Sequence, residues 1–239
     1  MMPAIYEEIN KLHSNNICKQ LTIKKHPFYK RNNPHKYKLV SLTFDDGPHE
    51  DFTPRILDIL DEYNVKATFF MIGKKALKHP EIVKRVFSSG HEVANHTFSH
   101  PVSFLLSESK CRTQVKKTND VLTELTGVKP KLFRIPGVLL TSKDQARLED
   151  NALQEGCIPV RWSCSTKDWM GSKRIIKQNV FNGNIKNGEV FLFHDGASKS
   201  IIGDRCATID TLPTVIKTLK KLQCLPVKTI DLLRMEGCE

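Results

Sequence analysis

The stretch "SLTFDDGPHE", residues 41–50, decides how the rest of the sequence is interpreted. An apolar, β-branched run over residues 37–44 leads directly into two adjacent carboxylates, Asp45 and Asp46, and stops at a Gly-Pro pair. Asp-Gly and Gly-Pro are typical of a tight turn after a strand, so the stretch alone predicts no more than a turn. Whether the carboxylates do chemistry depends on which other side chains the fold brings to the same place.

The composition is that of a globular protein with a sizeable core. The chain has 239 residues, of which 39% are hydrophobic, and none of its apolar runs approaches the ~18 residues of a membrane span. No membrane span is therefore expected. The first residues lack the apolar stretch of a secretory signal. The default expectation is a cytoplasmic protein, or a secreted one if the sequence is part of a longer chain.

The positive charge is concentrated at the start of the sequence. Residues 1–38 hold eight Lys/Arg against two Glu and so carry +6 of the net +11. We predict that 1–38 is a basic leader, loosely ordered or a helical extension, and that 39–239 is one domain. A leader that contacts nucleic acid or another anionic polymer is the alternative. Because the sequence shows no nucleic-acid-binding module, no nucleic-acid partner is expected.

Seven cysteines are scattered along the chain without a Cys-x-x-Cys pair. The odd count and irregular spacing argue against a full disulfide framework and against a thiolate zinc site. Reduced thiols are expected, with one or two bridges as the alternative.

Patterns typical of strands and helices alternate after the leader. We expect strands at 37–44, 65–73, 91–96, 130–136, 157–164 and 189–195, helices at 51–64, 79–90, 107–127, 141–156, 172–183 and 207–223, and a final structured segment at 225–233. This alternation predicts an α/β protein with a parallel sheet. About seven such units fit either a doubly wound open sheet or a small, incomplete barrel, and periodicity leaves both open.

Polar residues follow five of the expected strands. They are Asp45-Asp46, then His96 and His100, then Arg134, then Asp168-Trp169, and finally His194-Asp195. Because the carboxyl ends of parallel strands meet at one rim, we expect these side chains to converge there.

Two of these residues have the spacing of metal ligands. His96 and His100 are four residues apart, and in a helical turn both imidazoles would project to one side. Asp45 or Asp46 would add a carboxylate, and two His with one Asp leave the open position of a catalytic zinc site. Adjacent side chains on an extended segment point in different directions. One carboxylate would then hold the metal while the other serves as general base.

The remaining rim residues can complete an acyl hydrolysis. His194 can be the acid, with Asp168 holding its other nitrogen, and Arg134 can orient the base. Main-chain N–H groups after Pro136 can support an oxyanion. Each residue also has a structural alternative: a salt bridge for Arg134, a core histidine for His194, and a helix N-cap with a packed indole for Asp168-Trp169.

Five short motifs, taken in order, carry a resemblance to a known family. "TFDDGP", "HTFSH", "FRIPG", "STKDW" and "LFH" resemble the five motifs of the polysaccharide deacetylases, carbohydrate esterase family 4, also called the NodB-homology family. The resemblance covers about residues 38–235. It implies an α/β fold of the deformed (β/α)7-type barrel with parallel strands (NodB-like). It also implies a hydrolase that removes N-acetyl groups from N-acetylglucosamine units of chitin oligomers or peptidoglycan.

The resemblance also implies a role for each matching residue. Asp45 is similar to the catalytic base, Arg134 to its orienter, His194 to the acid and Asp168 to the residue that tunes it; Asp46, His96 and His100 are similar to the metal ligands, and Pro136, Gly137, Trp169 and Leu192 to substrate-binding residues. The implied cofactor is a divalent metal, first Zn²⁺, with Co²⁺ or Mn²⁺ as alternatives. The implied partner is an N-acetylated glycan, and a monomer is expected.

Two positions depart from the family pattern. Gly137 stands where the third motif usually has an aromatic residue, and Ser165 stands where the fourth motif has its first Asp. Neither departure touches the base or the ligands, so we expect an active enzyme. A carbohydrate-binding pseudoenzyme that keeps the ligands without turnover is the alternative. The sequence does not choose between the polymers.

Overall fold

The fold is built on one sheet whose strands all run parallel. The structure is a computed structural model that describes residues 37–101, 107–137, 140–197 and 203–235. The strands in these residues are β1 (Lys38–Gly47), β2 (Thr68–Met71), β3 (Glu92–Asn95), β4 (Leu132–Phe133), β5 (Ile158–Pro159), β6 (Cys164–Ser165), β7 (Glu189–His194) and β8 (Cys224–Pro226). Their order is β5-β4-β3-β2-β1-β7-β6, with β8 beside β1. Nearly all of the predicted leader lies outside the described residues.

The two edges of the sheet are joined by the chain itself. β5 and β6 are at opposite ends of the strand order but follow each other in sequence, so residues 160–163 cross from one edge to the other. The main-chain N–H of Val160 donates to Phe133 O at 2.8 Å, and that of Ser163 to Val190 O at 3.0 Å. The stretch 157–164 is thus two short strands rather than the single expected one. The curled sheet is a deformed barrel instead of a doubly wound open sheet.

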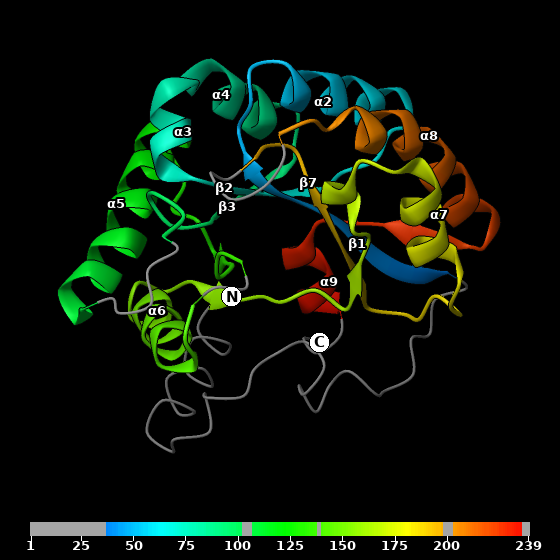
Figure 1. Ribbon diagram of the computed structural model, residues 1–239. Coiled ribbons are helices and arrows are strands. Elements are labelled where there is room, and N and C mark those ends of the chain that lie inside the picture. The colour runs from blue at the N-terminus through cyan, green and yellow to red at the C-terminus, as the bar shows by residue number, and fades with distance from the viewer. Residues whose placement is uncertain (1–36, 102–106, 138–139, 198–202, 236–239) are drawn as a thin grey trace.

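Most of the helices lie along the outer side of the sheet (Figure 1). The helical elements of the described residues are α2 (Phe52–Glu62), α3 (Gly73–Lys78), α4 (Pro80–Ser88), α5 (Glu108–Thr126), α6 (Ser142–Gln154), the 3₁₀ turn η4 (Asp168–Met170), α7 (Lys173–Phe181), α8 (Cys206–Lys221) and α9 (Thr229–Met235). Helix α3 was not predicted, and the segment 225–233 holds parts of both β8 and α9. Within this part of the chain, a helix with the length and apolarity to cross a membrane is not found.

Local signals explain where the longest helix begins and ends. The side chain of Ser107 accepts a hydrogen bond from the main-chain N–H of Lys110, which caps the start of α5. Gly127, at φ +73°, ends the helix in the left-handed conformation that glycine adopts without steric cost. The predicted helix at 107–127 is confirmed.

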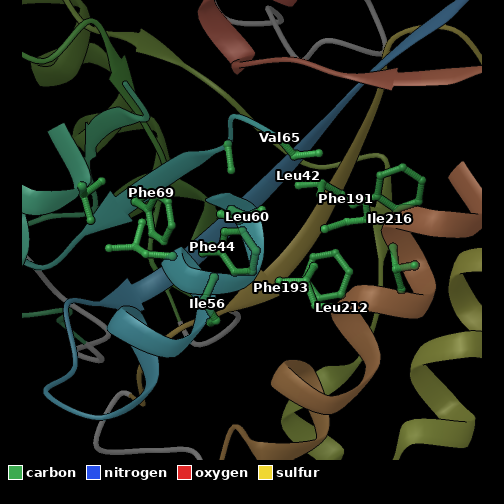
Figure 2. Close-up of a cluster of buried hydrophobic side chains, with 14 of the residues drawn as sticks. Leu42, Phe44, Ile56, Leu60, Val65, Phe69, Phe191, Phe193, Leu212 and Ile216 are labelled. Atoms are coloured by element: carbon green, nitrogen blue, oxygen red, sulfur yellow. The ribbon is translucent and has the colours of Figure 1, made fainter. Parts of the chain in front are cut away.

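Alternation along β1 separates an outer core from the barrel interior. Phe44 faces the helices and stacks on Phe69 and Phe193, with ring centroids 5.1 and 5.7 Å apart (Figure 2). Thr43 and Asp45 point to the other side, into the barrel. The barrel interior is filled by apolar residues from five strands, the link after β5 and α9, namely Leu39, Phe70, Ala94, Leu132, Val160, Val190 and Leu232. This cluster extends from the start of β1 to Phe70, over which the guanidinium of Arg134 lies.

The cysteines of the described residues are free: Cys111, Cys157, Cys164, Cys206 and Cys224. This agrees with the expected reduced state. Cys18 and Cys238 lie outside the described residues.

The outer core, the apolar cluster that contains Phe44, Phe69 and Phe193, allows a first testable prediction. Replacing Phe44 with Ala removes a fully buried ring and leaves a cavity between β1 and its neighbours. We expect the free energy of unfolding to fall by about 3–5 kcal/mol, measured by urea denaturation. Phe87→Ala, at a ring that is 38% exposed on α4, is the matched control and should cost less than about 1 kcal/mol. Equal losses in the two variants would contradict this assignment of the core.

Candidate active site

The polar rim expected from the sequence is present at the carboxyl ends of the strands. β1 supplies Asp45 and Asp46, His96 follows β3, Arg134 follows β4, and His194 ends β7. All five side chains are buried, and each is at most 7% exposed. These residues come from four strands, so the curl of the sheet is what brings them together.

Asp45 and Asp46 point into the same cluster although they are neighbours in an extended strand. Asp46 has a left-handed main chain, with φ +72°, and the pairing of β1 with β2 shifts register between Asp45 and Gly47. His96 Nε2 consequently lies 3.9 Å from Asp45 Oδ2 and 3.5 Å from Asp46 Oδ1. The expectation that the two carboxylates diverge is wrong, because one left-handed residue cancels the alternation of the strand.

Asp46, His96 and His100 form a possible metal site. Their ligand atoms all lie within 4.8 Å of one another, and His100 Nε2 is 3.2 Å from Asp46 Oδ1. The sequence predicted that the two imidazoles share a helical turn, but they do not. Residues 96–100 form a loop in which Thr97 and His100 have positive φ. The side chain of Asn95 accepts from the main-chain N–H of Thr97 at 2.8 Å, a local bond that competes with helix formation.

The chemistry of this trio suits a divalent cation. His96 Nδ1 bonds to the carbonyl oxygen of Arg134 at 2.9 Å, which leaves its Nε2 lone pair facing the cluster. Asp46 Oδ1 is buried and accepts no hydrogen bond from the described residues. A buried carboxylate oxygen without a partner is costly, and a cation between it and the imidazoles would remove that cost.

The charges of the trio fit the same role. Burial acts to raise the pKa of Asp46, but His96, His100 and His194 outweigh it and hold the pKa well below its ordinary value. Burial, with a smaller contribution from His96, lowers the pKa of His100 to about 4. An ionised carboxylate and a neutral imidazole are the ligand forms that a metal ion needs.

Arg134 fixes the orientation of Asp45. Its Nη1 donates to Asp45 Oδ1 and to Thr43 Oγ1, each at 2.7 Å. The guanidinium lies over the ring of Phe70, 3.9 Å from the centroid, and is 1% exposed. Arg134 Nη2 and Ser165 Oγ are both buried and have no hydrogen-bond partner among the described residues. With Ser165 in place of the Asp of the family motif, Arg134 Nη2 has no hydrogen-bond partner among the described residues. The bond from Arg134 to Asp45 is nevertheless present.

Asp168 orients the imidazole of His194 and raises its pKa. Its Nδ1 lies 2.8 Å from Asp168 Oδ1, while its main-chain N–H and the hydroxyl of Thr208 both donate to Asp168 Oδ2. Burial acts to lower the pKa of His194, but the charge and hydrogen bond of Asp168 outweigh it and raise the pKa to about 8. His194 is therefore protonated at neutral pH. The indole of Trp169 lies edge-on to its ring, with centroids 5.5 Å apart.

The other expected substrate-binding residues border this cluster to different degrees. Leu192 is buried on β7, paired in register with Thr43 of β1 and Ser165 of β6. Pro136 is buried. Gly137 is exposed, and a Cβ built on it would lie 3.6 Å from His100 Cε1. The missing aromatic side chain thus leaves space beside a ligand of the possible metal site.

Three residues near the cluster received no role from the sequence. Lys75 and Thr53 bond to the ends of β1 and β7, and Asp195 was noted only as a polar residue after a strand. Lys75 belongs to α3, the helix that the sequence pattern did not reveal. The adjacency of Asp195 to His194 was the one available signal.

The chain belongs to the polysaccharide deacetylase family, whose pattern matches residues 32–154. It is 41% identical over 194 residues to a peptidoglycan-N-acetylglucosamine deacetylase of Bacillus cereus, covering 80% of this chain and 67% of the relative. The solved peptidoglycan N-acetylglucosamine deacetylase Bc1960 is 37% identical, with a TM-score of 0.73 over 83% of this chain and 89% of that one. The likeness confirms the deformed (β/α)7-type barrel.

A second solved structure is a mutant of BA3943, a pseudoenzyme of carbohydrate esterase family 4 with restored enzymatic activity. It is 29% identical, with a TM-score of 0.72 over 83% of this chain and 68% of that one. The family thus contains enzymes that act on N-acetylglucosamine polymers as well as inactive members.

The Asp168–His194 pair makes a second testable prediction. In Asp168→Asn the opposing charge is lost, so burial should lower the pKa of His194 below its ordinary value of 6.5. NMR titration of the imidazole in metal-free protein would measure the shift. Asp58→Asn, at an exposed carboxylate on α2, should leave His194 near 8. A His194 pKa that stays near 8 in Asp168→Asn would refute the assigned cause.

The same pair makes a third prediction, about stability against pH. Because the folded state raises the pKa of His194, the stabilisation from its protonated form is complete below pH 6.5 and is lost as the pH rises through about 8. The difference in free energy of unfolding between wild type and Asp168→Asn should therefore shrink over this range. Urea denaturation at a series of pH values measures it, and a difference that does not change with pH contradicts the linkage.

Proposed function

We propose that this protein is a metal-dependent hydrolase that removes N-acetyl groups from N-acetylglucosamine units of peptidoglycan or chitin oligomers. The observation that carries the proposal is the position of Asp45 and His194. They are register partners on the adjacent strands β1 and β7, and His96 of the ligand trio is within 4 Å of Asp45. A base and a protonated acid on either side of one reacting carbon is what amide hydrolysis requires.

Asp46, His96 and His100 would hold the metal. A divalent cation there, with Zn²⁺ as the first candidate and Co²⁺ or Mn²⁺ as alternatives, supplies polarisation of the acetyl carbonyl and acidification of the attacking water. Asp45 Oδ2 is the free oxygen of a carboxylate whose Oδ1 is held by Arg134, so it can take the proton of that water. The oxygen of the water then forms the new bond to the acetyl carbon.

His194 completes the reaction by protonating the leaving group. Asp168 holds its Nδ1, so its Nε2 is the nitrogen free to donate. As the bond between the acetyl carbon and the sugar nitrogen breaks, His194 gives its proton to that nitrogen. The products are acetate and the free amine. Its pKa of about 8 keeps His194 in the donor form at neutral pH.

Leu192, Trp169 and the main chain after Pro136 would position the acetyl group. Leu192 lies two residues before His194 on β7, and the indole of Trp169 lies edge-on to the His194 ring. Both apolar side chains are suited to contact with the methyl group. The main-chain N–H of Gly137 can donate to the developing oxyanion because this role needs no side chain. The absent aromatic ring at this position is expected to weaken contact with the sugar rather than the chemistry.

The names of the relatives support N-acetylglucosamine in peptidoglycan as the first substrate to test. The alternative is a carbohydrate-binding pseudoenzyme, as one structural relative is. The intact Asp45–Arg134 bond and the complete ligand trio favour the enzyme.

Acetate release is the test of this function. Wild-type protein, stripped of metal and reloaded with zinc, should release acetate from peptidoglycan fragments or chitin oligosaccharides, and chelation should abolish the release. Asp45→Asn should lose about 10²–10⁴-fold in kcat because the base is gone. It should still bind zinc. His96→Ala should lose zinc binding together with activity.

Asp58→Asn and His79→Ala are the controls, since neither residue belongs to the cluster. Both should keep wild-type activity. Sugar binding without acetate release from any of these glycans would favour the pseudoenzyme. Release that resists chelation would refute the metal-dependent mechanism.

A further inference from the structure

One ammonium group joins the ends of β1 and β7 behind the ligand trio. Lys75 Nζ, from α3, donates to the main-chain oxygen of Asp46 at 2.6 Å and to that of Ala197 at 2.7 Å. Asp46 lies at the carboxyl end of β1, and Ala197 lies three residues after His194, which ends β7. A single side chain therefore ties the backbone of a proposed ligand to the strand end of the proposed acid.

Asp195 fastens the same two strand ends from a second direction. Its Oδ2 accepts a hydrogen bond from Thr53 Oγ1 at 2.6 Å, and Thr53 Oγ1 accepts one from the main-chain N–H of His49 at 2.8 Å. The main-chain N–H of Asp195 donates to Asp45 O at 3.1 Å. The segment that follows the two carboxylates is thus bonded to the segment that follows β7.

The two segments are in direct contact, without room for a side chain between them. A Cβ on Gly47 would overlap the carboxylate of Asp195, and a Cβ on Gly196 would overlap the carbonyl oxygen of Asp46. Because the backbones approach this closely, a shift of one strand end must move the other.

The conformation at Asp46 needs such support. A left-handed main chain in a residue other than glycine costs energy and persists only where the surroundings fix it. If Asp46 relaxed to extended geometry, its side chain would follow the alternation of the strand and turn away from His96 and His100. Lys75 bonds the carbonyl of this very residue, so it acts on the dihedral angles that aim the ligand.

We propose that Lys75 and Asp195 are positioning residues of the metal site, which hold the left-handed main chain of Asp46 so that its carboxylate faces the two imidazoles. The inference rests on the proposed metal site. Neither residue touches the metal or the substrate in this role. Both act through the backbone at the carboxyl end of β1.

Zinc affinity of the complete protein, measured by competition with a chelating dye, tests the role of Lys75. Lys75→Met should bind zinc about tenfold or more weakly, the size of effect expected when a group that supports a ligand is lost. Lys75→Arg, which keeps the charge and the donors, should recover most of the affinity. Lys78→Met, at an exposed lysine of the same helix, is the matched control and should bind as wild type does.

Asp195 is tested in the same way. Asp195→Asn keeps an oxygen that can accept from Thr53 and should stay within about threefold of wild type, whereas Asp195→Ala should lose about as much affinity as Lys75→Met. In the double variant Lys75→Met with Asp195→Ala, the loss should be smaller than the product of the single losses. Non-additivity is expected because both residues support one backbone segment.

Two results would overturn the inference. If Lys75→Met lowers the melting temperature but binds zinc as wild type does, its bonds only stabilise the fold. If a crystal structure of Lys75→Met shows Asp46 still left-handed and facing His96, the backbone does not need the support. Absence of zinc binding by wild type would instead refute the proposed metal site. The crystal structure of the variant would then still decide whether Lys75 holds the loop.

Discussion

The site depends on a single left-handed residue at the end of the central strand. β1 is buried along almost its whole length and pairs with three other strands, so it delivers its last residues to a fixed place. Strand geometry alone would send Asp45 and Asp46 to opposite faces. The positive φ of Asp46 brings both carboxylates to the same side. The proposed base and the proposed metal ligand therefore both lie within 4 Å of His96 Nε2.

Two buried carboxylates side by side repel each other, so each needs favourable partners of its own. The structure separates the partners: Asp45 bonds to Arg134, and Asp46 faces His96 and His100. Because Arg134 bonds to Asp45 and not to the trio, the orientation of Asp45 does not depend on whether the trio holds a metal. In the proposed mechanism, this separation gives the two adjacent acidic residues different roles.

The sequence predicted correctly which residues converge, but it did not predict the backbone geometry that brings them together. The rim follows from the parallel direction of the strands, since their carboxyl ends lie on one side of the sheet. The curl of the sheet then brings these ends close together. The prediction of a helical turn over His96–His100 was wrong. The Asn95 side chain accepts a hydrogen bond from the main-chain N–H of Thr97, and this bond competes with helix formation. The prediction that Asp45 and Asp46 point in different directions was wrong because the pattern of apolar residues does not reveal the positive φ of Asp46. Helix α3 has only six residues, too few for a helical pattern of apolar residues, so the sequence analysis did not identify Lys75.

The two departures from the family pattern act on different parts of the site. Ser165 is the half-buried last residue of the edge strand β6, and its Oγ, like Arg134 Nη2, has no hydrogen-bond partner among the described residues. Gly137 lies at the exposed side of the cluster, beside His100. The departure at Ser165 leaves the bond between Arg134 and Asp45, the proposed base, in place. The departure at Gly137 lies on the exposed side of the cluster, where the proposed glycan substrate would approach. For the proposed enzyme, altered substrate preference is therefore a simpler interpretation of these departures than loss of catalysis, because neither position belongs to the proposed base, acid or metal ligands.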